Sequence, residues 1–411
     1  MSPRPRLLFL SHCLPYPPHS GVTIRTFNVL RQLLREFDVT LLMFSRRNHQ
    51  PDGASREAGW RALRETGLDP HEAAPIGSDY SSARTIWDHL RSVATRRAYT
   101  FYQYQSTAFR RQLHEVLSRT SFNLIHMDAI DLHGTLDDLP AVPVVCTHHD
   151  IESHALRRRA AHAQPAALRP YIRYQAALVE RTERSLCPAF AANLVMSDID
   201  RQRLLELAPA ATVEIAPNGV DTTFFVPSGN GRPSGQIVFA GHTFVEANRD
   251  AVDFFLGDIW PLVRARRQSS SVHLIGRSSE ADRVRFCGHD GVIAHGYVPD
   301  IRPHLAEADC AVVPIRFGGG TRIKILDAWA MGRAVVSTSV GCEGLRAVDG
   351  ENILVRDAPE SFASAVAEVL ADPELRGRLG RAGRSTVEEF YSWDIVGSRM
   401  RQLYSTLALR P

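Results

Sequence analysis

A glycine run followed closely by two cations and one carboxylate marks residues 318–327 as the segment best suited to bind a ligand. Glycine has no Cβ atom, so the backbone at 318–320 can turn freely and approach a ligand closely. Arg322 and Lys324 supply positive charge, and Asp327 supplies a carboxylate three residues after the lysine. Cations suit phosphate groups, and a carboxylate suits ribose hydroxyls. An Asp–Lys pair on the surface of an ordinary helix would give the same pattern.

The flanking elements would place these side chains at the start of a helix. Residues 311–315 form an apolar run typical of a buried strand, and Thr321 can cap a helix that ends near Gly332. Residues 334–337 predict the next strand. This order of strand, glycine loop, helix and strand presents free backbone N–H groups and a positive helix dipole to an anion.

Lysine occurs once in the chain, at position 324, and the other 47 of the 48 basic residues are arginine. A lineage bias toward arginine explains the general pattern. A compact ammonium differs from a wide guanidinium fork, so the position of the single lysine gives independent support to a phosphate site.

Composition bounds the class of protein. With 411 residues, 44% hydrophobic and 23% charged, the chain is long enough for two globular domains. A net charge of +3 gives no argument for a nucleic-acid partner. Six scattered cysteines without a CxxC pair indicate a reduced, cytoplasmic setting and no zinc site. The first apolar run is too short for a signal peptide, and no apolar run reaches the roughly 20 residues that span a bilayer.

The first half of the chain predicts a doubly wound sheet. Residues 6–10 and 39–44 read as strands, with a Pro- and Gly-rich loop at 11–23 and a helix at 25–37 between them. Ligands of such sheets bind beyond the carboxyl ends of the strands, so Gly21 and Arg25 could face one. A simple turn at Gly21 is equally compatible with the sequence.

Other features of this half allow weaker predictions. The strand at 142–146 ends in THHD, which lacks metal-ligand spacing but places His149 at the same edge. A single long helix is expected over 154–187, and the aromatic residues between 99 and 104 favour packing over an acceptor pocket. The arginine-rich segments 157–159 and 168–184 allow contact with a membrane surface, although a solvated helix face is the commoner meaning of such charges.

The second half repeats the alternation of strands and helices. Residues 227–235 form a Pro-, Gly- and Ser-rich spacer. We therefore expect a first domain at 1–226, a linker at 227–235, a second domain at 236–390 and a last helix within 391–411.

Several segments together resemble glycosyltransferase family 4, whose retaining enzymes have the GT-B fold. The segments are LPYPPHSGVTIR, THHDIES, SDIDRQRL, APNGVDTTFF, GYVPDI, GGGTRIKILDAWAMGRAVVST and GCEGL. The resemblance covers nearly the whole chain and implies an α/β protein with two Rossmann-like doubly wound domains facing a central cleft. The first and the GGGTRIK segments most resemble the bacterial branch linked to exopolysaccharide and PEP-CTERM/exosortase systems. In this fold the last helix usually crosses back to the first domain.

The resemblance implies roles for particular residues. Asp327 stands where the family usually has a ribose-binding glutamate, and Gly319 stands where it has an earlier glutamate that contacts the donor sugar. The loop after the first strand of the second domain lacks the usual Arg and Lys, so Arg322 and Lys324 would bind the diphosphate, with Arg249 as a further candidate. His149 matches a histidine that contacts the transferred sugar. The implied donor-binding residues are Gly21, Gly241, Gly319, Gly320, Thr321, Arg322, Lys324 and Asp327.

The implied reaction moves a sugar, with retention, from a nucleotide-diphosphate donor to an acceptor hydroxyl. A UDP-sugar is favoured over a GDP-sugar as the donor. A sugar, a lipid-linked sugar or another hydroxyl compound is the expected acceptor, with no metal and no other cofactor. The predicted location is cytoplasmic, with peripheral contact at the cytoplasmic membrane face as an extension. A sugar-nucleotide epimerase and a non-catalytic scaffold of the same fold remain open. A dehydrogenase is disfavoured because no GxGxxG follows the first strand.

Overall fold

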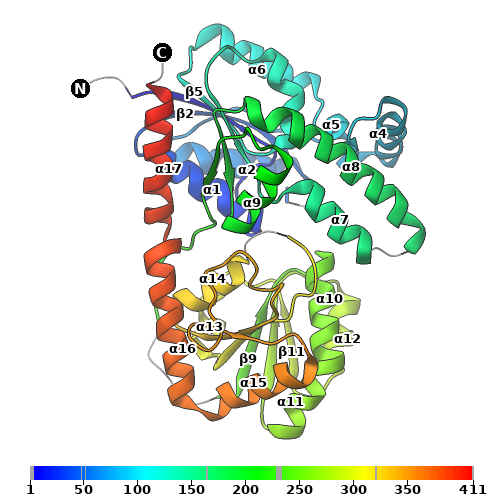
Figure 1. The fold of residues 1–411 in the computed structure, drawn as a ribbon, viewed down its shortest axis with the longest axis vertical. Helices are drawn as coiled ribbons and strands as arrows, with labels where there is room; N and C mark the ends of the chain where they lie inside the picture. Colours follow the sequence, from blue (N-terminus) through cyan, green and yellow to red (C-terminus); the bar gives the residue numbers. More distant parts are fainter. Residues whose placement is uncertain are drawn as a thin grey trace. The chain divides into compact units, whose positions relative to one another are not determined.

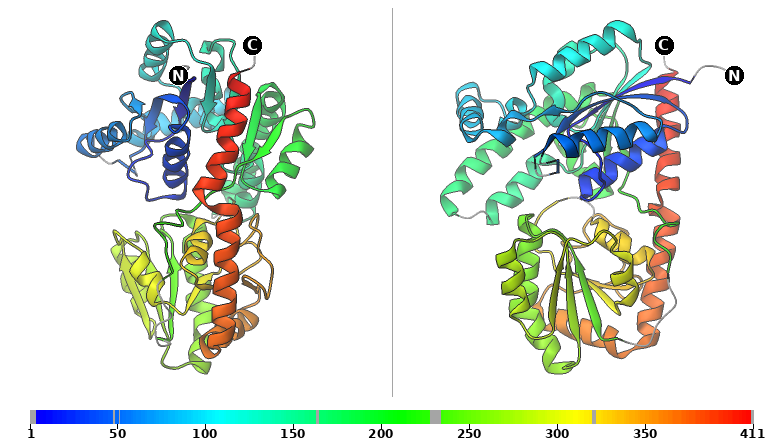
Figure 2. Two further views of the ribbon diagram at one scale, coloured as in Figure 1. Left: turned by 90° about the vertical axis from the view of Figure 1, so that its left-hand side faces the viewer. Right: turned by 180° about the vertical axis from the view of Figure 1, so that it is seen from behind.

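The computed structural model describes residues 4–47, 49–50, 52–162, 165–227, 234–319 and 322–409. The chain divides into two compact units, one formed by Met1–Pro217 with Val396–Pro411 and the other by Asn218–Ile395. In each unit helices flank both faces of one parallel sheet (Figures 1 and 2). This is the doubly wound α/β architecture that the sequence predicts.

The sheet of the first unit has the strand order β3-β2-β1-β5-β6-β7-β8, with β4 paired to β2. Its strands are β1 (Arg6–Ser11), β2 (Asp38–Ser45), β3 (Asp69–Pro70), β4 (Ala74–Pro75), β5 (Leu124–Met127), β6 (Val144–Thr147), β7 (Ala192–Val195) and β8 (Val213–Ile215). Its helices are α1 (Gly21–Leu33), α2 (Gly53–Glu65), α3 (Gly77–Tyr80), α4 (Ser82–Thr95), α5 (Tyr99–Gln103), α6 (Thr107–Arg119), α7 (Glu152–His162), α8 (Arg169–Leu186) and α9 (Asp198–Leu207), with short 3-10 turns at Ile130–Asp138, Ala166–Leu168 and Cys187–Ala189.

The order of strands reverses between β1 and β5. Leu7 to Leu10 of β1 are fully buried and pair in parallel with β2 on one side and β5 on the other. A continuous apolar run is expected of a parallel strand covered by helices on both faces. The carboxyl ends of β1 and β5 therefore meet at the reversal point, where doubly wound sheets bind ligands.

Helix α1 begins four residues earlier than the sequence predicted. The Ser20 side chain accepts a hydrogen bond from the Thr23 N–H, and the Thr23 hydroxyl accepts one from the Ser20 N–H. This capping box starts the helix at Gly21. Gly21 is therefore the exposed first residue of α1 and does not belong to the loop before it. The expectation that Arg25 faces a ligand is wrong. Arg25 is buried and donates to the carbonyl oxygens of Ala216 (2.8 Å) and Pro217 (3.0 Å).

The single helix expected over 154–187 is also wrong, because the structure forms α7 and α8 there. Pro165 precedes a 3-10 turn, and Pro170 stands in the first turn of α8. Proline lacks the backbone N–H that an α-helix interior requires, so these positions suit a break and a helix start. The two helices pack against one another along their length.

The second unit has a six-stranded parallel sheet in the order β11-β10-β9-β12-β13-β14. Its strands are β9 (Gln236–Ala240), β10 (Ser271–Ile275), β11 (Val292–Gly296), β12 (Cys310–Val313), β13 (Ala334–Ser337) and β14 (Leu354–Val355). Its helices are α10 (Glu246–Phe254), α11 (Trp260–Arg266), α12 (Glu280–Cys287), α13 (Arg302–Glu307), α14 (Ile323–Ala330), α15 (Pro359–Ala371) and α16 (Pro373–Thr386), with π-helical turns at Phe255–Ile259 and Val387–Tyr391. Here the strand order reverses between β9 and β12.

Helix α17 (Trp393–Ala408) begins in the second unit and continues into the first. Within the first unit Tyr404 is fully buried and its hydroxyl lies 2.5 Å from His126 Nδ1. Arg401 pairs with Glu36 at 2.9 Å. Residues 218–226, which we had assigned to the first domain, group with the second unit, where the Val220 N–H donates to the Tyr391 carbonyl. Most of the expected linker, 228–233, lies outside the described residues.

Candidate functional sites in the two units

The predicted strand, helix and following strand around residue 320 are confirmed as β12, α14 and β13. Of the glycine run between β12 and α14, residues 318 and 319 are described. Helix α14 begins at Ile323, so Lys324 stands in its first turn. The loop after β9 begins with Gly241 at the adjacent strand end. Lys324 and Gly241 therefore meet at the reversal point of this sheet, where a dinucleotide or nucleotide sugar would be expected to bind.

The ammonium of Lys324 is held between two groups of the second unit. It donates a hydrogen bond to Asn248 Oδ1 at 2.7 Å and lies 4.5 Å from the centre of the Phe239 ring. Burial, and to a lesser extent the nearby Arg322 charge, lowers the pKa of Lys324 to about 7. Burial destabilises the charged form of Lys324, and an anionic ligand would stabilise that form again. Lys324 is therefore a functional candidate on physical grounds.

A side chain at Gly241 would displace the Lys324 ammonium or the Asn248 amide. A Cβ atom at Gly241 would lie 2.9 Å from Lys324 Nζ and 3.0 Å from Asn248 Cγ. The neighbouring Gly276 has φ +137°, and a Cβ there would lie 2.3 Å from the Gly241 carbonyl oxygen. The sequence prediction of Gly241 at this site thus gains a steric reason.

Asp327 does not pair with Lys324, so the simple surface ion pair is excluded. Within the part of the chain that the structure describes, the Asp327 carboxylate has no hydrogen-bond or ion-pair partner. Burial raises the pKa of Asp327 to about 7. A partly exposed carboxyl group that gains no compensation inside the protein is suited to a ligand hydroxyl.

The glycine loop is partly described. Gly318 adopts φ +108°, a conformation that favours glycine, and Arg322 donates from Nη1 to the Gly319 carbonyl at 2.6 Å. Arg322 stands at the N-cap position of α14 without a side-chain cap. Gly320 and Thr321 lie outside the described residues, so their predicted roles in donor binding stay predictions. The helix cap predicted at Thr321 falls on Arg322 instead.

Arg249 is already engaged within the second unit. Its two terminal nitrogens donate to the Asp282 carboxylate at 3.2 Å and 2.9 Å, and its Nε donates to the Thr243 carbonyl. This ion pair leaves Arg249 poorly placed to serve as a diphosphate ligand. The sequence analysis did not identify Asn248, which lies one residue before Arg249 on α10, as the partner of Lys324. No signal within the sequence links Asn248 to Lys324, because the two are 76 residues apart.

In the first unit His149 belongs to a buried polar cluster at the carboxyl edge of the sheet. The cluster centres on Asp128, which follows β5, and adds His12 after β1, His126 in β5 and His149 after β6. His149 Nε2 lies 2.8 Å from the Asp128 carbonyl oxygen and 3.6 Å from Oδ1. Thr26 of α1 donates to Oδ2 at 2.7 Å. The sequence predicted the location of His149 but missed that these strand ends bring Asp128 and His12 to it.

The cluster holds a negative charge. Burial alone would raise the pKa of Asp128, but hydrogen bonds with His12, His126 and His149 outweigh it and keep this pKa well below its usual range. Burial lowers the pKa of His12 and of His126. A buried carboxylate of this kind orients an imidazole, as carboxylates beside functional histidines do.

Two histidine groups among the described residues have the geometry to hold a metal ion. One is His12, Asp128 and His149, and the other is His273, His295 and His304. In the first group, Asp128 Oδ2 already accepts from Thr26, and His149 Nε2 is directed to the Asp128 backbone. That group therefore reads as a hydrogen-bonded network.

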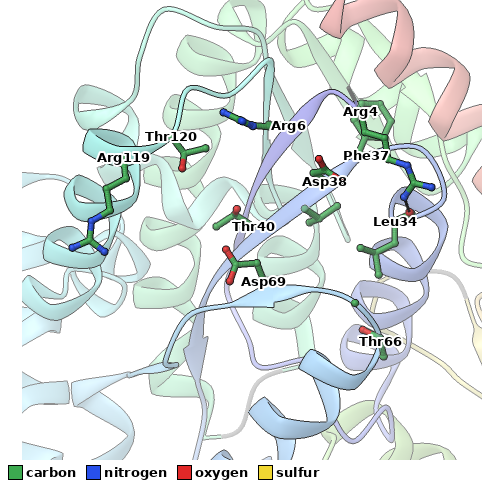
Figure 3. Close-up of a pocket in the computed structure, with 12 residues that line it drawn as sticks. Arg4, Arg6, Leu34, Phe37, Asp38, Thr40, Thr66, Asp69, Arg119 and Thr120 are labelled. Carbon is green, nitrogen blue, oxygen red and sulfur yellow. Dashed lines mark hydrogen bonds between the residues drawn. The ribbon is translucent and has the colours of Figure 1, made fainter. Parts of the chain in front are cut away.

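A pocket of about 520 Å³ lies at the opposite edge of the first sheet (Figure 3). Arg6 and Asp38 stand at the amino ends of β1 and β2, and Arg119 ends α6. Ligands of doubly wound sheets bind at the carboxyl ends, so this pocket is a poor candidate for the site. No helix in the described segments is both long and apolar enough to cross a membrane.

Comparison with known protein families identifies the class of protein to which this chain belongs. Residues 19–224 match the family described as "Glycosyltransferase Family 4", and residues 234–372 match "Glycosyl transferases group 1". The chain belongs to glycosyltransferase family 4. Its two parallel-sheet α/β units form the GT-B fold. HepE from Anabaena, solved in complex with UDP, has the same fold, with a TM-score of 0.67 at 13% identity over 98% of this chain and 100% of that one.

Curated relatives of this family 4 chain match over part of their length. The lipopolysaccharide core biosynthesis glycosyltransferase LpsE of Rhizobium meliloti is 30% identical over 167 residues, 40% of this chain and 46% of LpsE. A GDP-mannose-dependent alpha-(1-6)-phosphatidylinositol monomannoside mannosyltransferase of Mycobacterium tuberculosis is 28% identical over 217 residues, 47% of this chain and 55% of that protein. The matched region spans about half of each relative.

Proposed function

We propose that this family 4 chain transfers a sugar from a nucleotide-diphosphate sugar to an acceptor hydroxyl, with retention at the anomeric carbon, in the biosynthesis of a polysaccharide or glycoconjugate. The observation that carries the proposal is the partly exposed Lys324 beside Gly241 at the strand-order reversal of the second unit. A diphosphate is the kind of anion that this cation and the amino end of α14 would bind.

The residues of this chain would act mainly by electrostatics. Negative charge builds up on the diphosphate as its bond to the sugar breaks, and Lys324 and Arg322 would stabilise it with charges already in place. Asp327 would accept hydrogen bonds from the ribose. His149, held by Asp128, would contact the transferred sugar. With two cations in these roles, the proposed reaction requires no metal ion.

The nucleotide is the first feature to test. The names of compared proteins point both ways, since HepE was solved with UDP and the mycobacterial relative depends on GDP-mannose. We propose a UDP-sugar as donor, with a GDP-sugar as the alternative. Calorimetric titration of the purified chain with UDP, GDP and ADP, and then with their sugar conjugates, should show selective micromolar binding of one diphosphate.

Product analysis then separates the reaction classes. Transfer to an added acceptor, with the anomeric configuration of the donor retained by NMR and full activity in EDTA, would support the proposal. Conversion of the donor without an acceptor would indicate an epimerase, and binding without turnover of any kind would indicate a scaffold. A product with inverted configuration would correct only the proposed stereochemistry. A loss of activity in EDTA would correct only the proposed independence from metal ions.

We propose further that the acceptor is met at a membrane surface. Helix α4, at the periphery of the first unit (Figure 1), exposes Ile86 (61%), Trp87 (57%), Leu90 (57%) and Val93 (52%) along one side. Arg96 and Arg97 at its carboxyl end are also exposed. An apolar helix face bordered by arginines suits the interface of an anionic bilayer. The names of both relatives, which concern lipopolysaccharide and a phosphatidylinositol mannoside, are consistent with such an acceptor.

Vesicle flotation tests this contact. The chain should float with vesicles of mixed phosphatidylcholine and phosphatidylglycerol and less with phosphatidylcholine alone. Trp87→Gln with Leu90→Gln should abolish flotation. Val284→Gln, which changes an equally exposed residue of α12 (66%), should not. Equal flotation of both variants would reject α4 as the contact.

A further inference from the structure

Three histidines from three different elements of the second unit converge, and none of them is among the residues assigned to the donor. They are His273 in the middle of β10, His295 near the end of β11 and His304 on α13. One ligand nitrogen from each lies within 4.8 Å of the others. His295 Nε2 is 2.9 Å from His273 Nδ1, and the His295 and His304 ring centres are 4.4 Å apart.

A bound metal ion would replace the 2.9 Å hydrogen bond between His295 Nε2 and His273 Nδ1 and would require rotations of the rings. Two nitrogens that bind one tetrahedral zinc ion at about 2.0–2.1 Å lie about 3.3 Å from each other. The observed separations extend from just below to somewhat above that value. Two of the ligands come from paired strands and the third from the helix that leads into β12, so the backbone holds them in place.

Burial also acts on two of the three rings. Burial lowers the pKa of His273, and the neighbouring His295 and His304 lower it further, against an opposing effect of Glu307. Burial and His304 lower the pKa of His295 in the same way.

The groups around the three histidines allow an ion to bind. Ser271 Oγ lies 3.4 Å from His273 Nε2, on the other side of the ring from the Nδ1 that faces His295. Such an outer contact can fix the orientation of the His273 ring. All three histidines are partly exposed, so an ion can enter and a water molecule can complete its coordination.

We propose that His273, His295 and His304 form a binding site for a divalent transition-metal ion of the Zn²⁺ class. Imidazole nitrogens suit zinc, nickel and copper ions and do not suit magnesium or calcium, which prefer oxygen. The bound ion would link β10, β11 and α13 and thereby stabilise the second unit. It takes no part in the proposed sugar transfer.

The test uses the full chain, without a histidine tag and after treatment with a chelator. Calorimetric titration with ZnCl₂ should show one ion per chain with micromolar or tighter affinity, and MgCl₂ should show no binding under the same conditions. The thermal midpoint should rise when zinc is added. Spectra with Co²⁺ should show bands of nitrogen ligation without thiolate charge transfer.

Substitutions identify the ligands. The double variant His273→Gln with His295→Gln should lose at least tenfold in zinc affinity while nucleotide binding and circular dichroism stay unchanged. His289→Gln, an exposed histidine just before β11, is the matched control and should bind zinc normally. Cys287→Ser tests an exposed thiol of the same unit and should also bind normally.

Three results would overturn the proposal. They are the absence of stoichiometric zinc binding, binding that survives the double substitution, and binding that is lost in Cys287→Ser. If the double variant fails to fold, the single variant His304→Gln on the short helix α13 supplies the same comparison, and the cobalt spectrum of the unmodified chain tests nitrogen ligation without any substitution.

Discussion

The Nζ atom of Lys324 and the Oδ1 atom of Asn248 form a hydrogen bond of 2.7 Å. An amide oxygen orients an ammonium group without neutralising its charge, which a carboxylate at the same position would do. The single lysine of the chain is therefore oriented by a contact that does not neutralise its charged form.

Changing Asn248→Asp should weaken the binding of a nucleotide-diphosphate sugar at least tenfold. The new carboxylate would form an ion pair with Lys324 and would repel the diphosphate. Asn248→Ala should have a smaller effect, of about 0.5–1.5 kcal/mol, because only one hydrogen bond is lost. Calorimetry on the two variants measures both effects. An Asn248→Asp variant that binds as tightly as the unmodified chain would show that Lys324 does not contact the diphosphate.

Gly241→Ala should reduce donor affinity and turnover because its methyl group would displace Lys324 and Asn248. The matched control is Gly257→Ala, since a Cβ at Gly257 would have no atom within 4 Å. We expect normal donor binding in the control and a loss of about tenfold in Gly241→Ala, the equivalent of about 1.4 kcal/mol. Equal behaviour of the two variants in calorimetry would remove the steric argument for Gly241.

Donor affinity should fall as the pH rises above 7. The pKa of Lys324 is about 7, and an anionic ligand binds the charged form, so affinity should fall by up to tenfold per pH unit between pH 7.5 and 9. A nucleotide sugar is the appropriate probe because its diphosphate does not titrate in this range. Lys324→Met should bind weakly with a flat profile, and a flat profile in the unmodified chain would contradict the assignment.

Asp327→Asn should stabilise the ligand-free protein at pH 8 but not at pH 4. The folded-state pKa of about 7 lies above the ordinary value of 3.8, so the folded protein binds more protons than the unfolded chain between these values. Stability from this group is therefore lost as the pH rises from 4 to 7. Asparagine carries no charge and avoids this loss. Thermal unfolding should show a midpoint gain of a few degrees at pH 8 for about 1 kcal/mol, whereas a gain at pH 4 of the same size would point to another cause.

His149→Ala should reduce sugar transfer more than donor binding, because the residue is proposed to act on the sugar. His114→Ala, an exposed histidine of the same unit, is the control and should leave both unchanged. Asp128→Asn should reduce transfer in the same way if Asp128 acts by orienting His149, and its effect should be small in the His149→Ala background. Independent, additive losses in the double variant would separate the two residues.

Local patterns in the sequence were enough to predict the alternating elements. The predicted strands at β1 and β12 and the predicted helix at α14 are confirmed because each depends on neighbours in the chain. Errors arose where a polar cap or a proline decided the outcome. Ser20 and Thr23 start α1 before its apolar face begins, and Pro165 and Pro170 divide the region expected to be one helix.

The candidate sites could be predicted only in part, because their partners are distant in sequence. The edge where His149 lies follows from parallel-sheet topology, but its contact with Asp128 requires the strand order. Two arginine contacts likewise depend on the tertiary structure. Arg25 is buried against the carbonyl groups of 216–217, and Arg249 pairs with Asp282. Sequence spacing could place these arginines near a ligand edge but could not show that each already has a partner.

The division of the chain has a consequence for its synthesis on the ribosome. Residues 396–409 belong to the first unit, yet they follow the whole of the second unit in the chain. The buried Tyr404 and the Arg401–Glu36 pair can therefore form only after 218–395 have been translated. The first unit is thus completed only after the second has been synthesised, and a nascent chain must hold its first sheet with the α17 side uncovered until that helix emerges.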